Sequence, residues 1–116
     1  MKKDDTVYLR HILDAIDLID GYLQGVDESK FMATSLLQDG AIRQLEIIGE
    51  AVRHVSKELR KQYPAIPWED IAGMRDKLIH DYFGVDLEKV WVTVREDLPA
   101  LRQQTAEVMN SLSRNR

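Results

Sequence analysis

The chain has 116 residues, no cysteine and a formal net charge of −4 at pH 7. A chain of this length suits one domain, residues 1–116, with a single hydrophobic core. The lack of cysteine excludes disulfides, thiolate metal sites and a cysteine nucleophile, and the negative charge argues against a broadly basic surface that coats nucleic acid. No apolar run approaches the ~20 residues of a membrane span, and no signal-peptide core follows the start, so we expect a cytoplasmic protein without membrane contact.

Residues 5–23 are predicted to form the first helix, because apolar side chains recur along them at helical spacing. Residues 4–6 supply capping candidates at its start. A turn at residues 25–27 and a short helix through Phe31 and Met32 follow. The side chains of the first helix that we expect in the core are Leu9, Ile12, Leu13, Ile16, Ile19 and Leu23.

A second long helix is expected over residues 35–62. Its apolar residues step alternately by four and three positions, a heptad-type pattern suited to packing beside another helix at a shallow angle. Pro64 and Pro67 end the helix, because proline cannot continue the hydrogen-bond ladder. The apolar residues of this pattern are Ala41, Leu45, Ile48, Val52, Val55 and Leu59.

A third helix is predicted from about Trp68 to Phe83, with Gly84 just past its end. Glu69 and Asp70 lie in its first turn, where the helix dipole favours negative charge. This helix contains the residues of greatest chemical interest in the chain.

Asp86 caps the last predicted helix, whose apolar pattern runs to Leu112. Pro99 lies inside this pattern and is expected to kink or split the helix. With no convincing strand, the chain is predicted to be all-α: an antiparallel helical bundle of about four to five helices.

The third predicted helix carries Arg75, His80 and Tyr82 in the pattern Arg-x4-His-x-Tyr. Arginine is a permanent cation whose planar fork matches phosphate oxygens. Histidine can take and return a proton near neutral pH. The tyrosine adds a hydroxyl that can bind a ligand or be modified. These three groups are therefore suited to handling phosphates and protons.

The geometry of an ideal helix limits how these groups can act together. Arg75 and Tyr82 would lie within about 20° of each other, whereas His80 would lie about 140° from Arg75. Either the helix loosens before Gly84, or the Arg75 side chain bends round, or a second copy of the chain completes the site. Asp76, four residues before His80, could accept a hydrogen bond from the imidazole and hold it in place.

Arginine and histidine without a metal suit one reaction in particular. RNA carries its own nucleophile, the 2′-hydroxyl, which can attack the neighbouring phosphate while His80 moves protons and Arg75 stabilises charge on the phosphoryl oxygens. The reaction needs no divalent ion, and DNA lacks the required hydroxyl. The structural alternative is an ion pair of Arg75 with Asp76 or Glu69 and a histidine placed favourably at a helix C-terminus.

Several other polar groupings have both a functional and a structural interpretation. A basic run is either a local nucleic-acid patch or a solvated helix face: Arg53, His54, Lys57, Arg60 and Lys61. A second set shares one helix face and is either a metal or acid–base site or a polar stripe: Glu46, Glu50 and His54. A third set could bind a metal through oxygen but fits solvated positions: Asp14, Asp17 and Asp20 near His11. Trp68 and Trp91 are expected as core or interface anchors.

The segment from Pro67 to Phe83, PWEDIAGMRDKLIHDYF, closely resembles the signature of the HepT-like proteins, ribonuclease toxins of the HEPN superfamily. Two further segments agree with this resemblance. Leu45–Ala51 looks like that family's Glu-x-x-Gly-Glu-Ala segment, and Val90–Trp91 followed by Asp97–Leu101 looks like its C-terminal pattern. The resemblance spans nearly the whole chain, in the right order and spacing.

The resemblance implies a homodimer of antiparallel bundles whose catalytic segments face a cleft between the two copies. It implies that Arg75 and His80 are catalytic in metal-independent RNA cleavage and that Asp76 supports them. It also implies a partner, a small nucleotidyltransferase antitoxin of the MntA type, that transfers AMP from ATP onto Tyr82 and so switches the nuclease off. The added phosphate would lie near Arg75 and occupy the place of the RNA backbone.

We therefore expect the toxin component of a type VII-like toxin–antitoxin system, an endoribonuclease that acts on RNA without a metal or cofactor. Arg53, Lys57 and Lys77 are the candidates for binding RNA. Asp81, beside His80, departs from the family pattern, and its charge would repel RNA. The alternative is a non-catalytic helical dimer module that binds a nucleotide or a nucleotidyltransferase partner.

Overall fold

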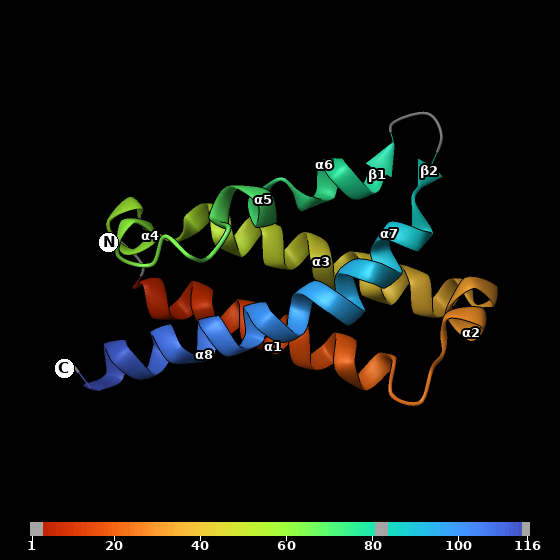
Figure 1. Cartoon of the computed structure of the whole chain (residues 1–116), viewed down its shortest axis with the longest axis horizontal. Helices are drawn as coiled ribbons and strands as arrows, with labels where there is room; N and C mark the ends of the chain where they lie inside the picture. The colour runs from red at the N-terminus through yellow and green to blue at the C-terminus, as the bar shows by residue number, and fades with distance from the viewer. Residues whose placement is uncertain (1–3, 81–83, 115–116) are drawn as a thin grey trace.

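The computed structural model describes residues 4–80 and 84–114, with the backbone alone at Ile79 and His80. This part of the chain is mostly helical, as expected, and α1 runs antiparallel to both α3 and α8 (Figure 1). No helix in the described ranges has the length and apolar character that a membrane crossing requires. The three long helices are α1 (Asp5–Tyr22), α3 (Ser35–His54) and α8 (Leu98–Arg114).

Shorter helices connect the long ones, and they make the helical segments more numerous than the four to five expected. The predicted helices over residues 35–62 and 68–83 are each broken in two, which accounts for most of the difference. By contrast, α7, the π-helical turn η1 and α8 follow one another directly. The short segments are α2 (Glu28–Ala33), α4 (Lys57–Gln62), α5 (Trp68–Ala72), α6 (Met74–Leu78), α7 (Leu87–Val92) and η1 (Thr93–Asp97).

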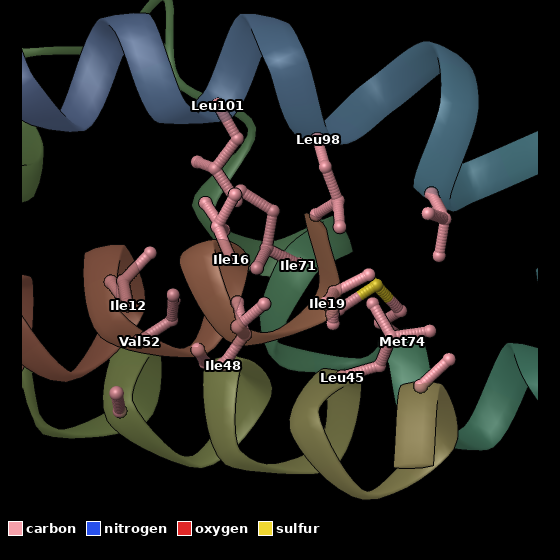
Figure 2. Packing of buried hydrophobic residues seen from close by; sticks show 14 of the residues in the cluster. Ile12, Ile16, Ile19, Leu45, Ile48, Val52, Ile71, Met74, Leu98 and Leu101 are labelled. Carbon is pink, nitrogen blue, oxygen red and sulfur yellow. The ribbon is translucent and has the colours of Figure 1, made fainter. Parts of the chain in front are cut away.

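Side chains from α1, α3 and α8 converge on one core, which Ile71 of α5 and Met74 of α6 join (Figure 2). The apolar patterns of the sequence predicted this core well, because a face of a helix that is apolar at every turn must be buried. All six apolar residues expected on the first helix and all six expected on the second are buried. Trp68 is buried as well, and its indole Nε1 donates to the Tyr63 carbonyl at 3.0 Å.

The predicted helix over residues 35–62 is wrong near its C-terminal end, where it is broken at residues 55 and 56. α3 ends at His54 and α4 begins at Lys57, with Val55 extended between them (φ −67°, ψ 137°). The sequence pattern did not reveal the break because the buried stripe continues through it.

Ser56 explains the break between α3 and α4. Its hydroxyl oxygen accepts a hydrogen bond from the Leu59 N–H at 3.2 Å and so caps α4. Asp5 at the start of α1 accepts hydrogen bonds from the Ser56 N–H at 2.8 Å and from the Ser56 hydroxyl at 2.7 Å. The junction is therefore fixed by a residue 51 positions away in the sequence.

The predicted third helix ends early. After α6, Ile79–His80 forms a short strand, β1, that pairs antiparallel with β2, Gly84–Val85. The expectation of no strand is therefore wrong for these four residues. Gly84 has a φ of +83°, a backbone conformation that favours glycine. Beyond β2, the Asp86 N–H donates to the Leu78 carbonyl at 2.8 Å.

The irregularity expected near Pro99 takes the form of the π-helical turn η1, and the helix continues through it. The Leu98 N–H donates to the Thr93 carbonyl, five residues back. Because Pro99 has no N–H to continue an α-helical ladder, a wider turn just before it shifts the hydrogen-bond partners and lets the helix continue. α8 then runs to Arg114 with Leu98 and Leu101 buried.

Candidate functional site

A groove of about 620 Å³ opens between α1, α3 and the α5–α6 segment. Many of the charged and aromatic side chains of the described residues line this groove. Arg75, Asp76 and Arg53, which the sequence singled out separately, all line it. The charged and aromatic residues of its lining are Tyr8, His11, Arg43, Glu46, Glu50, Arg53, His54, Arg75 and Asp76.

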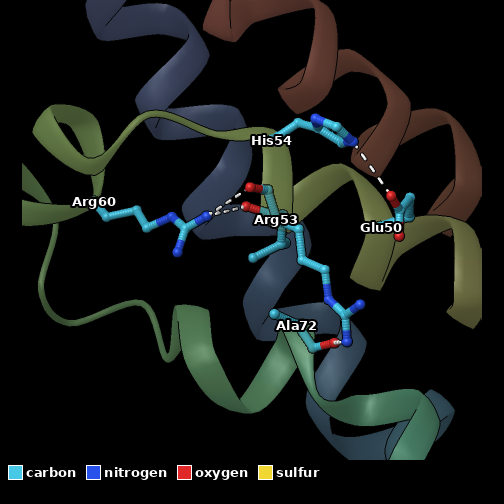
Figure 3. Close-up of polar contacts among 6 residues, drawn as sticks. Glu50, Arg53, His54, Arg60 and Ala72 are labelled. Atoms are coloured by element: carbon cyan, nitrogen blue, oxygen red, sulfur yellow. Dashed lines mark hydrogen bonds and ion pairs between the residues drawn. The ribbon is translucent and has the colours of Figure 1, made fainter.

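Gly49 allows the floor of the groove to form. A Cβ atom at this position would lie 3.2 Å from the Ile71 carbonyl oxygen and 3.4 Å from that of Ala72, so a side chain here would push α3 and α5 apart by a few tenths of an ångström. Across the same contact, Arg53 donates from Nη2 to the Ala72 carbonyl at 3.2 Å (Figure 3). The end of α5 is therefore held against α3, which brings α6 and Arg75 to the edge of the groove.

Arg75 faces Glu46 across the groove. Its Nε donates to Glu46 Oε2 at 3.2 Å, while the side chain stays 62% exposed and that of Glu46 is 31% exposed. An ion pair this exposed contributes only about 0–1 kcal/mol. The pair therefore orients Arg75 without removing the guanidinium from solvent, and its remaining N–H groups can bind an anion. The structural alternative, an ion pair of Arg75 with Asp76 or Glu69, is not the one formed.

His80 lies in β1, two residues beyond the last residue of α6. The ideal-helix angle of about 140° between Arg75 and His80 therefore does not apply. The helix does loosen before Gly84, which was the first of the three possibilities considered. The hydrogen bond expected from the His80 imidazole to the Asp76 carboxylate assumed a regular helix through both residues, and this premise is wrong. Tyr82 and Asp81 lie outside the described residues.

Aromatic rings form the far wall of the groove. The Tyr8 and His54 rings are stacked, with centroids 5.1 Å apart and an interplanar angle of 17°. The His11 ring meets Tyr8 edge-on at 6.1 Å and 90°. His54 Nε2 lies 3.2 Å from Glu50 Oε1 one helical turn away (Figure 3). The predicted polar stripe of α3 therefore faces the groove, with Glu46 paired to Arg75 and Glu50 to His54.

The charges of the groove are nearly balanced. Three arginines, Arg43, Arg53 and Arg75, stand against three carboxylates, those of Glu46, Glu50 and Asp76. Among the described residues, Arg43 has no hydrogen-bond or ion-pair partner. Arginine forks suit phosphate, and clustered arginines can bind a polyanion even where the net charge of a protein is negative. The groove is therefore chemically suited to a phosphate-bearing ligand.

The basic run predicted on one helix is divided in the structure. Arg60 turns inward, and its Nη2 donates to the Val52 and Arg53 carbonyls at 2.8 and 3.0 Å (Figure 3). Its Nε donates to the Val55 carbonyl at 3.1 Å, so the guanidinium caps the end of α3. Lys57 lies outside the groove, at an adjoining hollow that it shares with Tyr8 and His54.

Lys77 does not join the other RNA-binding candidates. Its Nζ atom donates to Asp70 Oδ1 at 3.1 Å. It lines a separate groove between α5–α6 and the α7–η1–α8 helix. Of the three candidates, only Arg53 therefore shares a groove with Arg75.

One of the three acidic residues singled out on α1, Asp17, forms an ion pair. Arg102 Nη2 lies 2.8 Å from Asp17 Oδ1, and this hydrogen bond and charge raise the pKa of Arg102 above its ordinary value. Among the described residues, no group of histidine, aspartate and glutamate side chains has an arrangement that could hold a metal ion. Trp91 packs on Phe31 with ring centroids 5.3 Å apart, in keeping with its expected anchoring role.

Sequence reasoning missed Tyr8 and Arg43 as groove residues and considered His11 only for a metal site. Tyr8 and His11 lie three residues apart on α1, beside the apolar stripe rather than on it. That position is their one signal in the sequence. It predicts that they lie at the edge of the core, but it does not predict that α3 brings His54 against them.

Comparison with protein families and known proteins gives a consistent result. Residues 12–108 match the family model described as Ribonuclease HepT-like. The chain is 43% identical over 102 residues to a protein of Thermococcus cleftensis named as a probable ribonuclease HepT, covering 88% of this chain and 93% of that protein. It is 41% identical over 102 residues to a candidate RNase of Caldanaerobacter subterraneus, covering 88% and 91%.

A relative from Methanocaldococcus jannaschii is longer than this chain. It is 44% identical over 116 residues, all of this chain and 52% of that protein, which is named for a gamma-glutamylcyclotransferase together with a candidate RNase. The chain thus spans about half of the length of this relative. No solved structure matches the chain.

Proposed function

This chain belongs to the HepT-like ribonuclease family, and from that premise we propose that it is a metal-independent endoribonuclease and the toxin of a toxin–antitoxin system. The observation that carries the proposal is the exposed guanidinium of Arg75 at the edge of a groove that also contains Arg43 and Arg53. The chain leaves α6 only two residues before His80, so the histidine follows the arginine closely on a segment that is not constrained to a helix.

The proposed reaction uses the RNA's own hydroxyl. The 2′-oxygen attacks the adjacent phosphorus and forms a new O–P bond, while the bond from phosphorus to the 5′-oxygen of the next nucleotide breaks. His80 accepts the proton of the 2′-hydroxyl or supplies one to the leaving 5′-oxygen, and Arg75 stabilises the negative charge that builds on the phosphoryl oxygens. The products are a 2′,3′-cyclic phosphate and a 5′-hydroxyl. Asp76 is proposed as a residue that supports Arg75 and His80.

Regulation by modification is part of the proposal. A nucleotidyltransferase partner would join the Tyr82 oxygen to the α-phosphorus of ATP and release pyrophosphate, with the tyrosine proton passing to a base. The AMP phosphate would add negative charge and acceptor oxygens close to Arg75 in the sequence, where they can compete with the RNA backbone.

A second copy of the chain is also part of the proposal. Leu18, Tyr22 and Leu36 are large apolar side chains that are exposed, and they lie on α1 and α3, the two helices that border the groove. Exposed apolar side chains on two neighbouring helices favour association with another protein surface. This supports a homodimer whose two grooves lie near the contact between the copies.

The test compares the purified protein, of verified intact mass, with its His80→Ala and Arg75→Gln variants on total RNA in EDTA. Loss of an acid–base or charge-stabilising group lowers a rate about 10²- to 10⁴-fold, so we expect cleavage by the parent and almost none by either variant. Arg10→Gln, an exposed arginine outside the groove lining, is the matched control and should cleave normally. Cleavage that needs Mg²⁺, or cleavage of DNA, would contradict the mechanism.

One observation favours a second candidate function. Glu46 already engages Arg75, and three carboxylates line the groove, which weakens its attraction for RNA. A non-catalytic dimer module that binds a nucleotide or the nucleotidyltransferase would not require a groove with an excess of positive charge. Absence of cleavage by protein that carries no AMP, at every concentration tried, would favour this candidate.

A further inference from the structure

The stacked pair of Tyr8 and His54 has no part in the proposed reaction, although it lines the same groove as Arg75. We propose that this pair, named here the aromatic platform, stacks a nucleobase of the single-stranded RNA whose phosphate Arg75 binds. The inference rests on the proposed function and adds to it the form of the substrate and the residues that position it.

The spacing along α3 suits this arrangement. Glu46, Glu50 and His54 lie on successive turns, so the platform is about 12 Å along the helix axis from the position at which Arg75 meets Glu46. A short single-stranded segment can span this distance with a phosphate at one end and a base at the other. Arg53 lies between these two points in the same groove and can bind an intervening phosphate, whereas Arg43 lies beyond Glu46 and can bind a phosphate on the far side of Arg75.

The platform is held in place before any ligand arrives. Tyr8 is half-buried and packs against the core, while the edge of the His11 ring contacts its side. The Tyr8 ring covers one face of His54, and Glu50 accepts a hydrogen bond from His54 Nε2 at 3.2 Å. The His54 side chain nevertheless remains 54% exposed. A fixed, flat and accessible ring needs little reorganisation to accept another ring on its free side.

The chemistry of the platform favours a single strand over a duplex. Every base has a π-face, so stacking on a tyrosine–histidine pair tolerates any sequence, whereas bases within a duplex already stack on one another. The same reasoning predicts weak sequence selectivity at the platform. Selectivity would arise mainly from whether a base is free to leave its own stack.

The test measures binding without cleavage, using the His80→Ala protein and a short single-stranded RNA that carries 2-aminopurine, a base whose fluorescence falls when it stacks. We expect the fluorescence to fall on binding. Added substitutions Tyr8→Ala or His54→Ala should weaken affinity about 5- to 100-fold and abolish the fluorescence change. His54→Phe, which keeps a flat ring and removes the hydrogen bond to Glu50, should retain most of both signals.

A second set of oligonucleotides separates stacking from a general loss of structure. RNAs that each lack one base are compared on the protein with and without His54→Ala. One abasic position should reproduce the loss of affinity when His54 is present and have no further effect when it is absent, as expected for two groups in direct contact. A structural defect would instead weaken all of the RNAs equally, and circular dichroism of each variant reports the fold directly.

The outcomes for the platform and for the proposed function are distinct. If the parent cleaves RNA but His54→Ala changes neither affinity nor fluorescence, the platform is overturned and the nuclease stands. If duplex RNA binds as well as the single strand and gives the same fluorescence change, the inferred substrate form is wrong. If the parent neither cleaves nor binds RNA, the proposed function fails and the platform fails with it.

Discussion

Helix α3 has two faces that differ in burial and in chemistry. One face packs in the core and carries Leu45, Ile48 and Val52; the other lines the groove and carries Glu46, Glu50 and His54. Both faces follow the same helical periodicity, so the same backbone geometry supports the core and the charged wall. Substitutions on the core face should therefore lower stability and RNA cleavage together. Substitutions on the groove face should alter cleavage while the free energy of unfolding hardly changes.

The largest effect is expected on the core face, for Ile48→Ala. Ile48 is fully buried, and truncation removes apolar contacts and leaves a cavity, which costs about 2–5 kcal/mol of unfolding free energy. The neighbouring Ile47 lies on the groove side and is only partly buried, so Ile47→Ala is the matched control and should cost less. Urea unfolding of the two variants measures the difference. Equal losses would mean that the two faces of α3 do not differ in the way described.

Gly49→Ala tests the close contact between α3 and α5. The new methyl would lie 3.2 Å from the Ile71 carbonyl, a backbone atom that cannot move without α5, so we expect a loss of about 1–3 kcal/mol together with slower RNA cleavage. Gly40→Ala is the control. Its methyl would meet the Tyr22 ring at 3.2 Å, but Tyr22 is exposed and can move, and alanine favours the helix by about 0.5–1 kcal/mol.

Thermal unfolding and the cleavage rate would be measured for both glycine variants. A neutral Gly49→Ala would show that the close approach of α3 and α5 is not needed to place Arg75. A Gly40→Ala variant as unstable as Gly49→Ala would point to a general intolerance of side chains on this helix instead.

Ser56→Ala tests the junction at which α3 ends and α4 begins. It removes the cap on Leu59 and one hydrogen bond to Asp5, with an expected cost of about 1–2 kcal/mol. Ser35→Ala is the control, because Ser35 is exposed and its hydroxyl has no partner among the described residues. If α3 instead continued through residue 56, both variants would be nearly neutral in chemical unfolding.

The sequence predicted the core more accurately than it predicted the ends of helices. Apolar spacing identified buried residues on both sides of the α3–α4 break, because burial depends on which face a residue occupies. The break itself depends on Asp5, which lies far from Ser56 in the sequence. A local pattern cannot contain such an interaction. The same limit explains why α6 was expected to continue through His80, where pairing with Gly84 and Val85 ends the helical run.

The candidate site was predictable in part. Arg75, Asp76 and Arg53 were singled out as chemical candidates and do line one groove. Tyr8 and Arg43 were missed because the packing of α1 on α3, not any motif, brings them there. The pairing of Arg75 with Glu46 likewise joins two segments 29 residues apart. Residues that belong to a motif can be identified from the sequence. Residues that complete a groove from another helix can be identified only once the fold is known.

The smallest effect on stability, and the sharpest test of the groove face, is expected for Glu46→Gln. The amide oxygen can still accept a hydrogen bond from Arg75 Nε, so the arginine should keep its position while the groove loses one negative charge. The pair is exposed, and the free energy of unfolding should change by less than about 1 kcal/mol. RNA should bind more tightly, with a lower KM and a steeper dependence of affinity on salt, because the charge of Arg75 is no longer offset by Glu46 and can replace a counterion on the phosphate backbone.

Asp17→Asn provides the matched control for Glu46→Gln. It makes the same carboxylate-to-amide change in an exposed pair with an arginine, Arg102, but lies outside the groove. It should leave KM and the salt dependence unchanged. If Glu46→Gln instead lowered kcat without lowering KM, the Glu46 carboxylate would be required in the chemical step, and the groove face would contain an acid–base group in addition to its charges.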